Sequence, residues 1–192
     1  MLEHPKAPFP YNGIETVDET MDNQQAIGKI AGLYLGEGHF ILSKKKEKTN
    51  WKFHAEIGFS NTDPALIHFI CDWLDGLGAR YFMHQNSNGC WQIRVTRHVA
   101  LLAMLNEMEP HLIGRKKHEA ALVRRFVEHR IRLNSQKLAR IKKLGNNQFS
   151  PYGEFEHALC DEKLALRESS ETMSIPRISV VDMRDDMAHS VV

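Results

Sequence analysis

The sequence predicts an α+β fold in which two antiparallel hairpins and several amphipathic helices share one core. Residues 51–60 alternate apolar and polar side chains, as a strand with one buried face does. Residues 63–77 carry a broad apolar stripe at helical spacing, and clusters of Gly, Pro and Asn separate such segments from their neighbours. A chain of 192 residues with 42% hydrophobic side chains is long enough to bury one sizeable core.

The composition favours a soluble, intracellular protein of the cytoplasm or an organelle, with no membrane contact. No apolar run approaches the length of a membrane span, and the N-terminus lacks the basic start and apolar stretch of a signal peptide. Cys71, Cys90 and Cys160 are odd in number and include no CxxC pair, which argues against a disulfide framework and a zinc site. The spacing of His84, Cys90 and His98 fits neither a zinc finger nor a ββα-metal nuclease.

Charge is distributed unevenly along the chain. Residues 29–143 contain 20 Lys and Arg against 10 Asp and Glu, while the two flanks contain 5 against 14, so a net charge of +1 hides a basic centre. Such a centre supplies contacts for the phosphates of a nucleic acid; the alternative is a solvated charged surface. We expect a flexible acidic N-terminal extension over 1–22, a main domain over 23–145 and an acidic C-terminal extension of unknown role over 146–192.

The first expected element is a helix that begins after Asp22 and ends near Gly38. Asp22 and Gln25 have the spacing of a capping box, which satisfies backbone N–H groups at a helix start. Gly38 follows the last helical residues and is suited to end the helix in a left-handed conformation.

Three glycines, Gly28, Gly32 and Gly36, recur at four-residue spacing within this helix and therefore share one face. Each glycine in a helix interior costs about 1 kcal/mol relative to alanine, so the three together forfeit about 3 kcal/mol. Close packing of a partner helix against this face would offset the loss. The alternative is that the glycines pack against the chain's own sheet.

Two hairpins are expected. The first joins residues 39–44 to residues 51–60 through the polar stretch KKEKTN, and the second joins residues 79–84 to residues 90–96 through the turn QNSNG. In the second strand of each hairpin polar residues alternate with apolar ones. One face of the sheet should therefore be lined with hydrogen-bonding side chains.

Helices account for most of the remaining sequence. Asp63 is a suitable cap and Pro64 a suitable first-turn residue for the helix between the hairpins, and Pro110 with Gly114 breaks a later helical stretch. The expected helices cover residues 63–77, 97–107, about 115–132, from Asn134 to near Gly145, and 154–167. A weak strand-like segment, IPRISVV, lies beyond them. The order along the chain is αββαββαα.

The stretch IAGLYLGEG at residues 30–38 is similar to the signature of the LAGLIDADG homing endonucleases, with Glu37 at its last acidic position and Leu35 in place of its first acid. The segments SNTD, LDGLG and EPHLIGRKKHEAALV resemble further parts of the family in the same order, so the resemblance covers about residues 24–132. It implies an αββαββα fold with an antiparallel, saddle-shaped sheet, helices on one of its faces, and a DNA-binding and cleavage domain over 23–145.

The resemblance also implies an activity, which is site-specific, Mg²⁺-dependent cleavage of double-stranded DNA by a homing endonuclease of an intron or an intein-like mobile element. Mn²⁺ or Ca²⁺ would suit the same site. Because the chain has one signature, it should act as a homodimer on a long, roughly palindromic site. In the family the signature helices pack together, which places Gly28, Ala31, Gly32, Leu35 and Gly36 at the dimer interface. The alternative is a relative that binds without cutting, such as an intron RNA maturase, with intron RNA as a partner, or a transcription regulator.

By the same resemblance, Glu37 is a catalytic residue and a metal ligand, with Gly36 beside it in the metal site. Mg²⁺ keeps most of its waters and accepts one or two carboxylates, so few protein ligands are needed. Asn61 in SNTD matches a residue that positions water, and Thr62 is the neighbouring alternative. Asn61 also suits a purely structural role at a helix entry ahead of Asp and Pro.

The family's active-site lysine maps to the GRKK stretch, where we choose Lys116 as the third catalytic residue. Arg115 and Lys117 remain open as alternatives, because an alignment shift of one residue would exchange them. Each of the three can also serve as a phosphate contact.

The polar face of the sheet is expected to read base edges in the major groove, as the family's saddle does. An ordinary exposed sheet face carries similar residue types, which is the alternative. The candidates are Ser43, Lys45, Lys52, His54, Glu56, Arg80, His84, Gln92, Arg94 and Thr96, with Lys44, Lys46, Lys48 and Lys117 nearer the phosphates.

Overall fold

A computed structural model describes residues 23–47, 50–141 and 152–172. Predictions for the N-terminal extension, the Asp22 cap, Lys48, the break near Gly145 and the segment IPRISVV lie outside these residues. The elements are α1 (Asn23–Glu37), β1 (Gly38–Glu47), β2 (Asn50–Asn61), α2 (Pro64–Gly76), β3 (Phe82–Gln85), β4 (Trp91–Val95), α3 (His98–Met108), the 3₁₀ helix η1 (Glu109–His111), α4 (Gly114–Ile141) and α5 (Glu154–Thr172).

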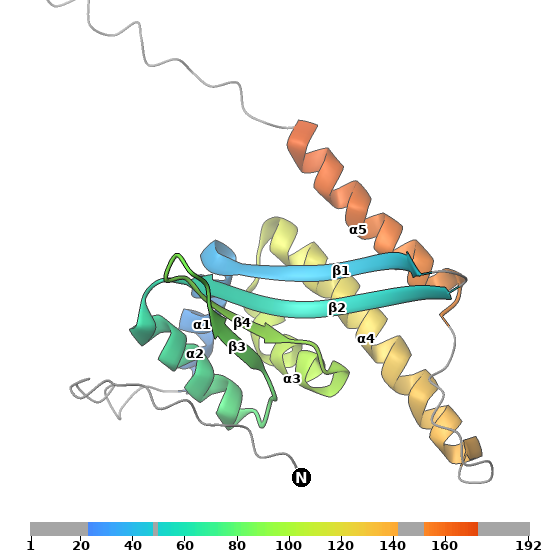
Figure 1. Cartoon of the computed structure of the whole chain (residues 1–192), viewed down its shortest axis with the longest axis horizontal. Coiled ribbons are helices and arrows are strands. Elements are labelled where there is room, and N and C mark those ends of the chain that lie inside the picture. The colour runs from blue at the N-terminus through green and yellow to red at the C-terminus, as the bar shows by residue number, and fades with distance from the viewer. Residues whose placement is uncertain (1–22, 48–49, 142–151, 173–192) are drawn as a thin grey trace, which may run out of the picture.

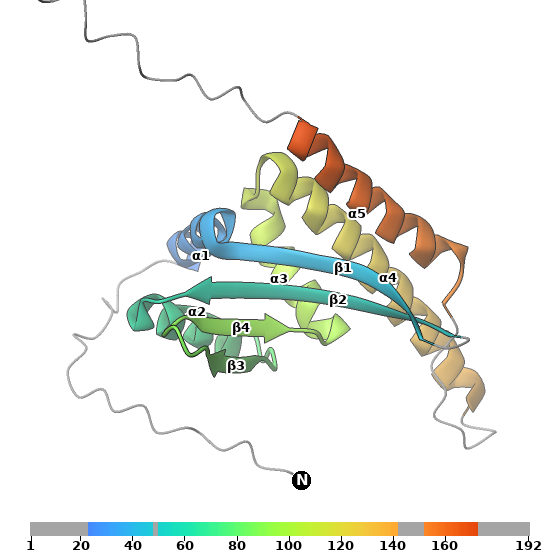
Figure 2. The same ribbon diagram turned by 45° about the horizontal axis from the view of Figure 1, so that its top comes forward.

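The four strands form one antiparallel sheet in the order β1-β2-β4-β3 (Figure 1). The long hairpin β1–β2 extends beyond the shorter β3–β4 pair; in the turned view α2, α3 and α4 pass behind the sheet, and α5 lies beside β1 (Figure 2). The predicted α+β fold, with an antiparallel sheet and helices on one of its faces, is confirmed. The opposite face of the sheet carries no helix among the described residues.

The core lies between the sheet and the helices. Alternate residues of β1, β2 and β4 point into it, as the period of a strand requires. Tyr34 of α1 is fully buried there and packs against Phe40 and Phe59, with ring centroids 4.6 and 5.1 Å away. The inward-facing strand residues are Phe40, Leu42, Ala55, Ile57, Phe59, Ile93 and Val95.

The first hairpin is longer than the sequence suggests. Backbone pairing continues through much of the stretch predicted as a polar connection, to Glu47 in β1 and from Asn50 in β2. Lys45 lies directly opposite Lys52, which is unfavourable for like charges. The Glu47 carboxylate pairs with the Lys52 ammonium, and this hydrogen bond lowers the pKa of Glu47 from its ordinary value. Polar side chains therefore did not mark the strand ends, because on one face Lys44 pairs with Asp161 and Trp51 packs against His157, while on the other face Lys52 pairs with Glu47.

The predicted break before Asn134 is wrong, since α4 continues through Asn134 as a helix of 28 residues. Ser135, the next polar residue, donates its hydroxyl hydrogen to the carbonyl of Ile131 within the helix. The local polar groups are thus satisfied without a turn. None of the described helices is both long and apolar enough to cross a membrane.

Gly38 does not end α1 in a left-handed conformation, contrary to the prediction. Among the described glycines, φ is positive at Gly78 (62°), Gly89 (82°) and Gly114 (56°), and Gly78 follows α2 as expected. At Gly38 the chain passes directly from α1 into β1. A Cβ there would lie 2.3 Å from Cδ2 of Tyr34, so glycine is required by the adjacent ring rather than by a turn.

Helix α5 lies in the predicted C-terminal extension, yet it packs against α4 and β1 (Figure 2). It buries Leu159 and Cys160 in the core and extends to Thr172, beyond the predicted end. Its Glu156 accepts a hydrogen bond from Arg130 of α4 at 3.0 Å, and both side chains are about 1% exposed. The folded unit therefore includes α5.

Candidate functional site

The glycines of α1 face outward. Gly28, Gly32 and Gly36 are exposed, and a Cβ built on any of them would meet no heavy atom of the described residues within 4 Å. The alternative that they pack against the chain's own sheet is therefore wrong. They leave a strip of exposed backbone along α1, hereafter the glycine strip, which a second helix can approach closely.

The other two predicted interface residues lie differently. Ala31 is 2% exposed and belongs to the core, on the side of α1 that also carries Ile30 and Tyr34. Its assignment to an interface with a partner needs correction, because Ala31 directly precedes Gly32 and one residue turns a helix by about 100°. Leu35 is partly buried against the core and remains partly accessible.

Glu37 is the last residue of α1 and is exposed. It lies beside Gly36, in the last turn of the helix, where backbone carbonyl groups have no helical partner. A carboxylate and a carbonyl are hard oxygen donors, the kind that Mg²⁺ and Ca²⁺ prefer. No group of three or more His, Cys, Asp or Glu side chains suited to a metal is found within the described residues, and this includes the surroundings of His84, Cys90 and His98.

Lys116, in the first turn of α4, reaches this end of α1 from 78 residues farther along the chain. Its Nζ donates a hydrogen bond to the carbonyl oxygen of Gly38, next to Glu37, and lies 5.5 Å from the centroid of the Tyr34 ring. Burial lowers the pKa of Lys116 from its ordinary value; Glu119 acts in the opposite direction.

The structure distinguishes Lys116 from its two neighbours. Arg115 is directed to Glu119, with Nε donating to Oε1 at 3.0 Å, and Lys117 is exposed on the surface of α4. Lys116 donates to the carbonyl of Gly38, the first residue after α1. Its assignment as the catalytic lysine stays a prediction.

Asn61 is the last residue of β2 and has a clear structural role. Its Oδ1 accepts the backbone N–H of Asp63 at 2.8 Å, and the Asp63 carboxylate in turn accepts the N–H of Ala65 at 2.8 Å. These bonds lead the chain into α2, as the alternative interpretation held. Because Phe59 pairs with Gly38, Asn61 also lies at the end of the sheet where α1 meets β1. Thr62 is exposed one residue farther on.

Most predicted readout residues share the open face of the sheet. The register pairs Ser43 with His54, Lys45 with Lys52, and His84 with Gln92, and members of each pair point to the same side. Arg94 lies on this face as well, with its guanidinium 2.6 Å from Oε1 of Gln92. Arg80 and Thr96 are exposed just outside β3 and β4.

Glu56 lies on the open face but is only 4% exposed, which differs from its predicted role in direct readout. Its carboxylate oxygens lie 3.0 Å from Nε2 of His54, 3.4 Å from Nε2 of His39 and 3.8 Å from Nε of Arg94. His54, His39 and Arg94 cover the Glu56 carboxylate. Glu56 is therefore placed to orient these three side chains rather than to contact a ligand. His39 was not predicted from the sequence, although it is four residues before Ser43 in β1 and therefore lies on the same face.

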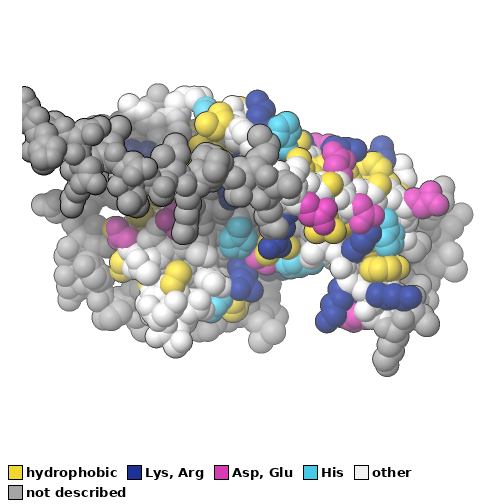
Figure 3. All heavy atoms as spheres, turned by 90° about the horizontal axis from the view of Figure 1, so that it is seen from above, with side chains coloured by type: hydrophobic (Ala, Val, Ile, Leu, Met, Phe, Trp, Pro, Cys, Tyr) yellow, Lys and Arg dark blue, Asp and Glu magenta, His cyan; other side chains and the backbone are white. Residues whose placement is uncertain are grey.

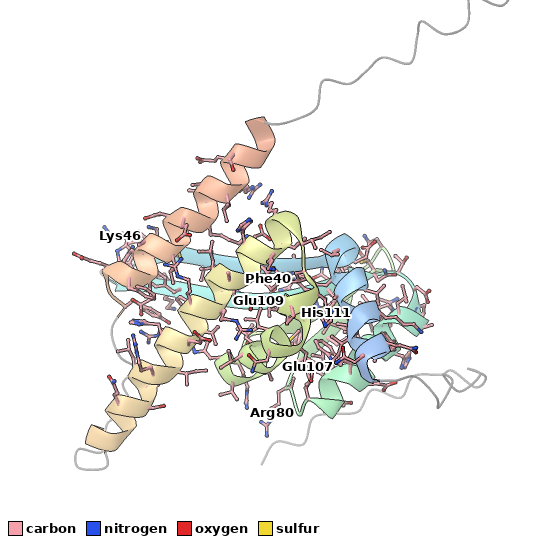
Figure 4. All side chains as sticks on the ribbon, turned by 180° about the vertical axis from the view of Figure 1, so that it is seen from behind. Phe40, Lys46, Arg80, Glu107, Glu109 and His111 are labelled. Carbon is pink, nitrogen blue, oxygen red and sulfur yellow. The ribbon has the colours of Figure 1, made fainter. Side chains whose placement is uncertain are left out.

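The lysines assigned to phosphates do not form one group. Lys44 points to the helical side of the sheet, where it pairs with Asp161 of α5 at 2.6 Å, so its assignment needs correction. Seen from behind, Lys46 lies beside α5 while Arg80 lies well apart from it (Figure 4). Lys117 is exposed on α4. In the view from above, acidic, basic and histidine side chains are interleaved (Figure 3).

This arrangement is similar to that of solved homing endonucleases. The group I intron-encoded homing endonuclease I-CeuI, complexed with DNA, matches with a TM-score of 0.55 and 13% identity over 76% of this chain and 69% of that chain. I-CvuI, in complex with its target in the presence of calcium, matches with a TM-score of 0.52 and 16% identity over 74% and 82% of the two chains. The LAGLIDADG homing endonuclease I-GzeII, in complex with its DNA target, gives 0.51 and 18% over 74% and 44%.

The sequence itself matches no protein-family model and no curated protein. At identities of 13–18% the likeness to solved structures concerns the fold. The chain has the LAGLIDADG homing-endonuclease fold.

Proposed function

We propose that this chain is a site-specific DNA endonuclease that works as a homodimer with Mg²⁺ on a long, roughly palindromic duplex. The observation that carries the proposal is the end of α1, where an outward glycine strip leads to the exposed Glu37 and Lys116 is held at the adjacent Gly38. The LAGLIDADG homing-endonuclease fold supports it, and the three solved endonucleases compared above are complexed with DNA or with their target.

The glycine strip supports the homodimer. A twofold axis along the strip would pack α1 against its copy, with the backbones close because no side chain intervenes. Glu37 lies at the end of the same helix, so the axis would bring two copies of this carboxylate together. One subunit supplies half of a site, and two subunits complete it.

The donors at this end of α1 fit Mg²⁺. The Glu37 carboxylate, together with the Gly36 carbonyl, would hold the ion, and DNA phosphate oxygens and water complete a shell of hard oxygen ligands. When bound, Mg²⁺ supplies an activated water and stabilises the charge that develops in phosphodiester hydrolysis. Mn²⁺ and Ca²⁺ take similar ligands and would compete for the same donors.

Lys116 contributes a positive charge beside these donors. Because burial lowers its pKa, its ε-amine releases a proton more readily than a lysine in water and can exchange protons with solvent at the cleavage site. The Asn61 side-chain carbonyl is used by Asp63, which leaves its amide N–H groups to orient a water.

The open face of the sheet would bind the duplex. Its arginine, lysine, glutamine, histidine and serine side chains are of the types that read base edges in the major groove. They project from neighbouring strands with no helix in front of them, within the described part of the chain. Base contacts would set the target sequence, and lysines at the margins would contact phosphates.

Glu37→Gln tests the proposal. The uninterrupted target is obtained by joining the two DNA flanks of the gene, and the wild type should cut it with Mg²⁺. Because Glu37→Gln removes a metal ligand from the surface, we expect cleavage to be abolished and the Kd for the same DNA to change little. Gel-based cleavage and a binding titration measure the two effects.

Asp72→Asn, an exposed carboxylate on α2, is the matched control and should cut like the wild type. A Glu37→Gln protein that still cuts, or that loses binding instead, contradicts the metal role. If the wild type binds the joined flank and does not cut it, the protein is a nucleic-acid-binding relative that lacks cleavage activity.

A further inference from the structure

A buried carboxylate connects α5 to the helix that carries Lys116. Glu119 of α4 is 5% exposed, and Nζ of Lys163 in α5 donates to its Oε1 at 2.7 Å. Arg115 donates to the same oxygen at 3.0 Å. Lys163 is itself only 14% exposed, so this contact is a largely desolvated ion pair between two helices.

The pair sits next to Lys116. Glu119 is three residues after Lys116 in α4, and residues at this spacing lie on the same face of a helix. The carboxylate is also the charge that acts most strongly on Lys116, raising its pKa against the effects of burial, Lys163 and Arg115. The same face therefore carries the lysine that contacts Gly38 and the carboxylate that Lys163 holds.

A buried carboxylate that loses one cation is destabilised and moves toward another partner or toward water. Without Lys163, Glu119 would retain Arg115, whose side chain is 44% exposed, as the partner seen on its own helix. The carboxylate would then be drawn away from the α5 side. The first turn of α4, including Lys116, would follow it or lose its fixed orientation.

We propose that Lys163 is a positioning residue for cleavage, because through Glu119 it fixes the first turn of α4 and thereby places Lys116 at the Gly38 carbonyl beside Glu37. This inference rests on the proposed endonuclease function. It assigns to α5 a role in the cleavage site, although this helix lies outside the segments that carry the family resemblance.

The alternative is that Lys163 only holds α5 in place. Several other contacts already do this: the buried Arg130–Glu156 pair, the Lys44–Asp161 and Arg125–Glu162 pairs at 2.6 and 3.0 Å, and the buried Leu159 and Cys160. Loss of one ion pair among these should leave α5 docked. A structural role and a positioning role therefore predict different results.

Lys163→Met keeps the aliphatic stem and removes the charge. With the full chain and its joined-flank DNA, we expect single-turnover cleavage to fall about 10- to 100-fold, the range found when the hydrogen-bond partners of metal ligands are removed, while the Kd changes little. The melting temperature should fall modestly, because Glu119 loses one cation and keeps Arg115. Glu119→Gln should reduce cleavage similarly, the two changes together should cost little more than either alone, and Lys163→Arg should restore the rate. Glu162→Gln, which removes the neighbouring α5–α4 pair, is the matched control and should cut at the wild-type rate.

A second measurement does not depend on cleavage. The rate at which an acylating reagent modifies Lys116, read by mass spectrometry, should rise several-fold in Lys163→Met and stay unchanged in Glu162→Gln, because Lys116 loses its fixed contact with Gly38. If the wild type cuts no DNA while this rate rises, the proposed function fails and the positioning contact stands. Unchanged cleavage and unchanged labelling of Lys116 in Lys163→Met overturn the inference. A parallel loss of melting temperature, DNA affinity and cleavage that Lys163→Arg does not restore also overturns it, because a purely structural role would produce that result.

Discussion

At two positions in the sheet, Gly38 and Gly58, an aromatic ring occupies the space that a side chain would need. A Cβ at Gly38 would lie 2.3 Å from the Tyr34 ring, and one at Gly58 would lie 2.3 Å from Nε2 of His39. The absence of a side chain at each glycine leaves room for the ring beside the end of α1 that carries Glu37. Tyr34 lies under Lys116, and His39 is directed to the buried carboxylate of Glu56.

Gly38→Ala should destabilise the protein by about 1–3 kcal/mol, because the methyl group overlaps a fully buried ring that has no room to move. The free energy of unfolding from a urea titration measures the loss. Gly76→Ala is the matched control, since a Cβ at Gly76 meets nothing within 4 Å. Equal stabilities of the two variants would show that the Tyr34 ring can shift without cost.

At the scale of single elements, α1 and α5 differ in how they pack against the rest of the subunit. Helix α1 buries Ile30 and Tyr34, and within the part of the chain that the structure describes no atom covers its glycine strip, although such glycines weaken a helix. Helix α5 is held by the buried Leu159 and Cys160 and by charged pairs, of which the Arg130–Glu156 pair is the most deeply buried. The first pattern is what the proposed homodimer requires of α1, and the second is that of a helix docked within its own subunit.

Gly32→Leu should convert a dimer into a monomer while leaving the subunit folded. The leucine has open space in the subunit, yet its side chain would separate two helices that meet along the glycine strip. Light scattering gives the mass, and circular dichroism gives the helix content. Asp72→Leu on the exposed surface of α2 is the control and should remain dimeric. A dimeric Gly32→Leu protein would place the subunit contact elsewhere.

The docking of α5 should depend on pH through Glu156. Burial alone would raise the pKa of this carboxyl, but hydrogen bonds from Gly153 and Arg130 outweigh it and lower the pKa. A lowered pKa in the folded state stabilises the protein fully above the unfolded value of about 4.3, and this contribution is lost as the pH falls through the folded value.

Glu156→Gln should therefore be less stable near neutral pH, by on the order of 3 kcal/mol, because Arg130 loses the charge that it faces in the core. Below about pH 4.3 the wild type should lose stability more steeply than the variant. Melting temperatures at a series of pH values test this. Parallel curves for the two proteins would mean that Glu156 keeps its ordinary pKa. Glu162→Gln, at an exposed pair, should follow the wild type.

At the scale of the whole molecule, the sheet separates two environments. Helices and core cover one side, and polar side chains from four strands form the other. Adjacent residues of β1 therefore have different roles. Lys44 pairs with Asp161 on the helical side, whereas Lys45 points to the open face beside Ser43 and Lys52.

This separation predicts how salt should affect DNA binding. Each phosphate that a lysine neutralises adds about 0.9 to the slope of log Kd against log salt concentration. Lys45→Gln removes one lysine from each subunit of the proposed homodimer and should lower this slope by about 1.8. Lys44→Gln should leave it unchanged, because Asp161 already neutralises Lys44. Titrations of a DNA duplex at several salt concentrations provide the slopes. A wild-type affinity that does not vary with salt would exclude the open face as a phosphate-binding surface.

The sequence by itself determined the elements and the fold class. The alternation in residues 51–60 and the apolar stripe over 63–77 are local patterns, and each predicted the element that forms. The four-residue spacing of the α1 glycines also defined one face of a helix. The predicted hairpin ends and the break at Asn134 were wrong, because backbone hydrogen bonds continue wherever polar side chains find water or a local partner.

The tertiary structure alone decided which residues meet. Lys116 reaches Gly38 across 78 residues, Glu119 meets Lys163, and Glu56 is covered by histidines from two strands. No periodicity encodes these contacts, since they depend on how α4 and α5 cross the sheet and on which side of each strand is buried. Local spacing fixes the direction of a side chain relative to its own helix or strand, and the packing of distant elements fixes what it touches.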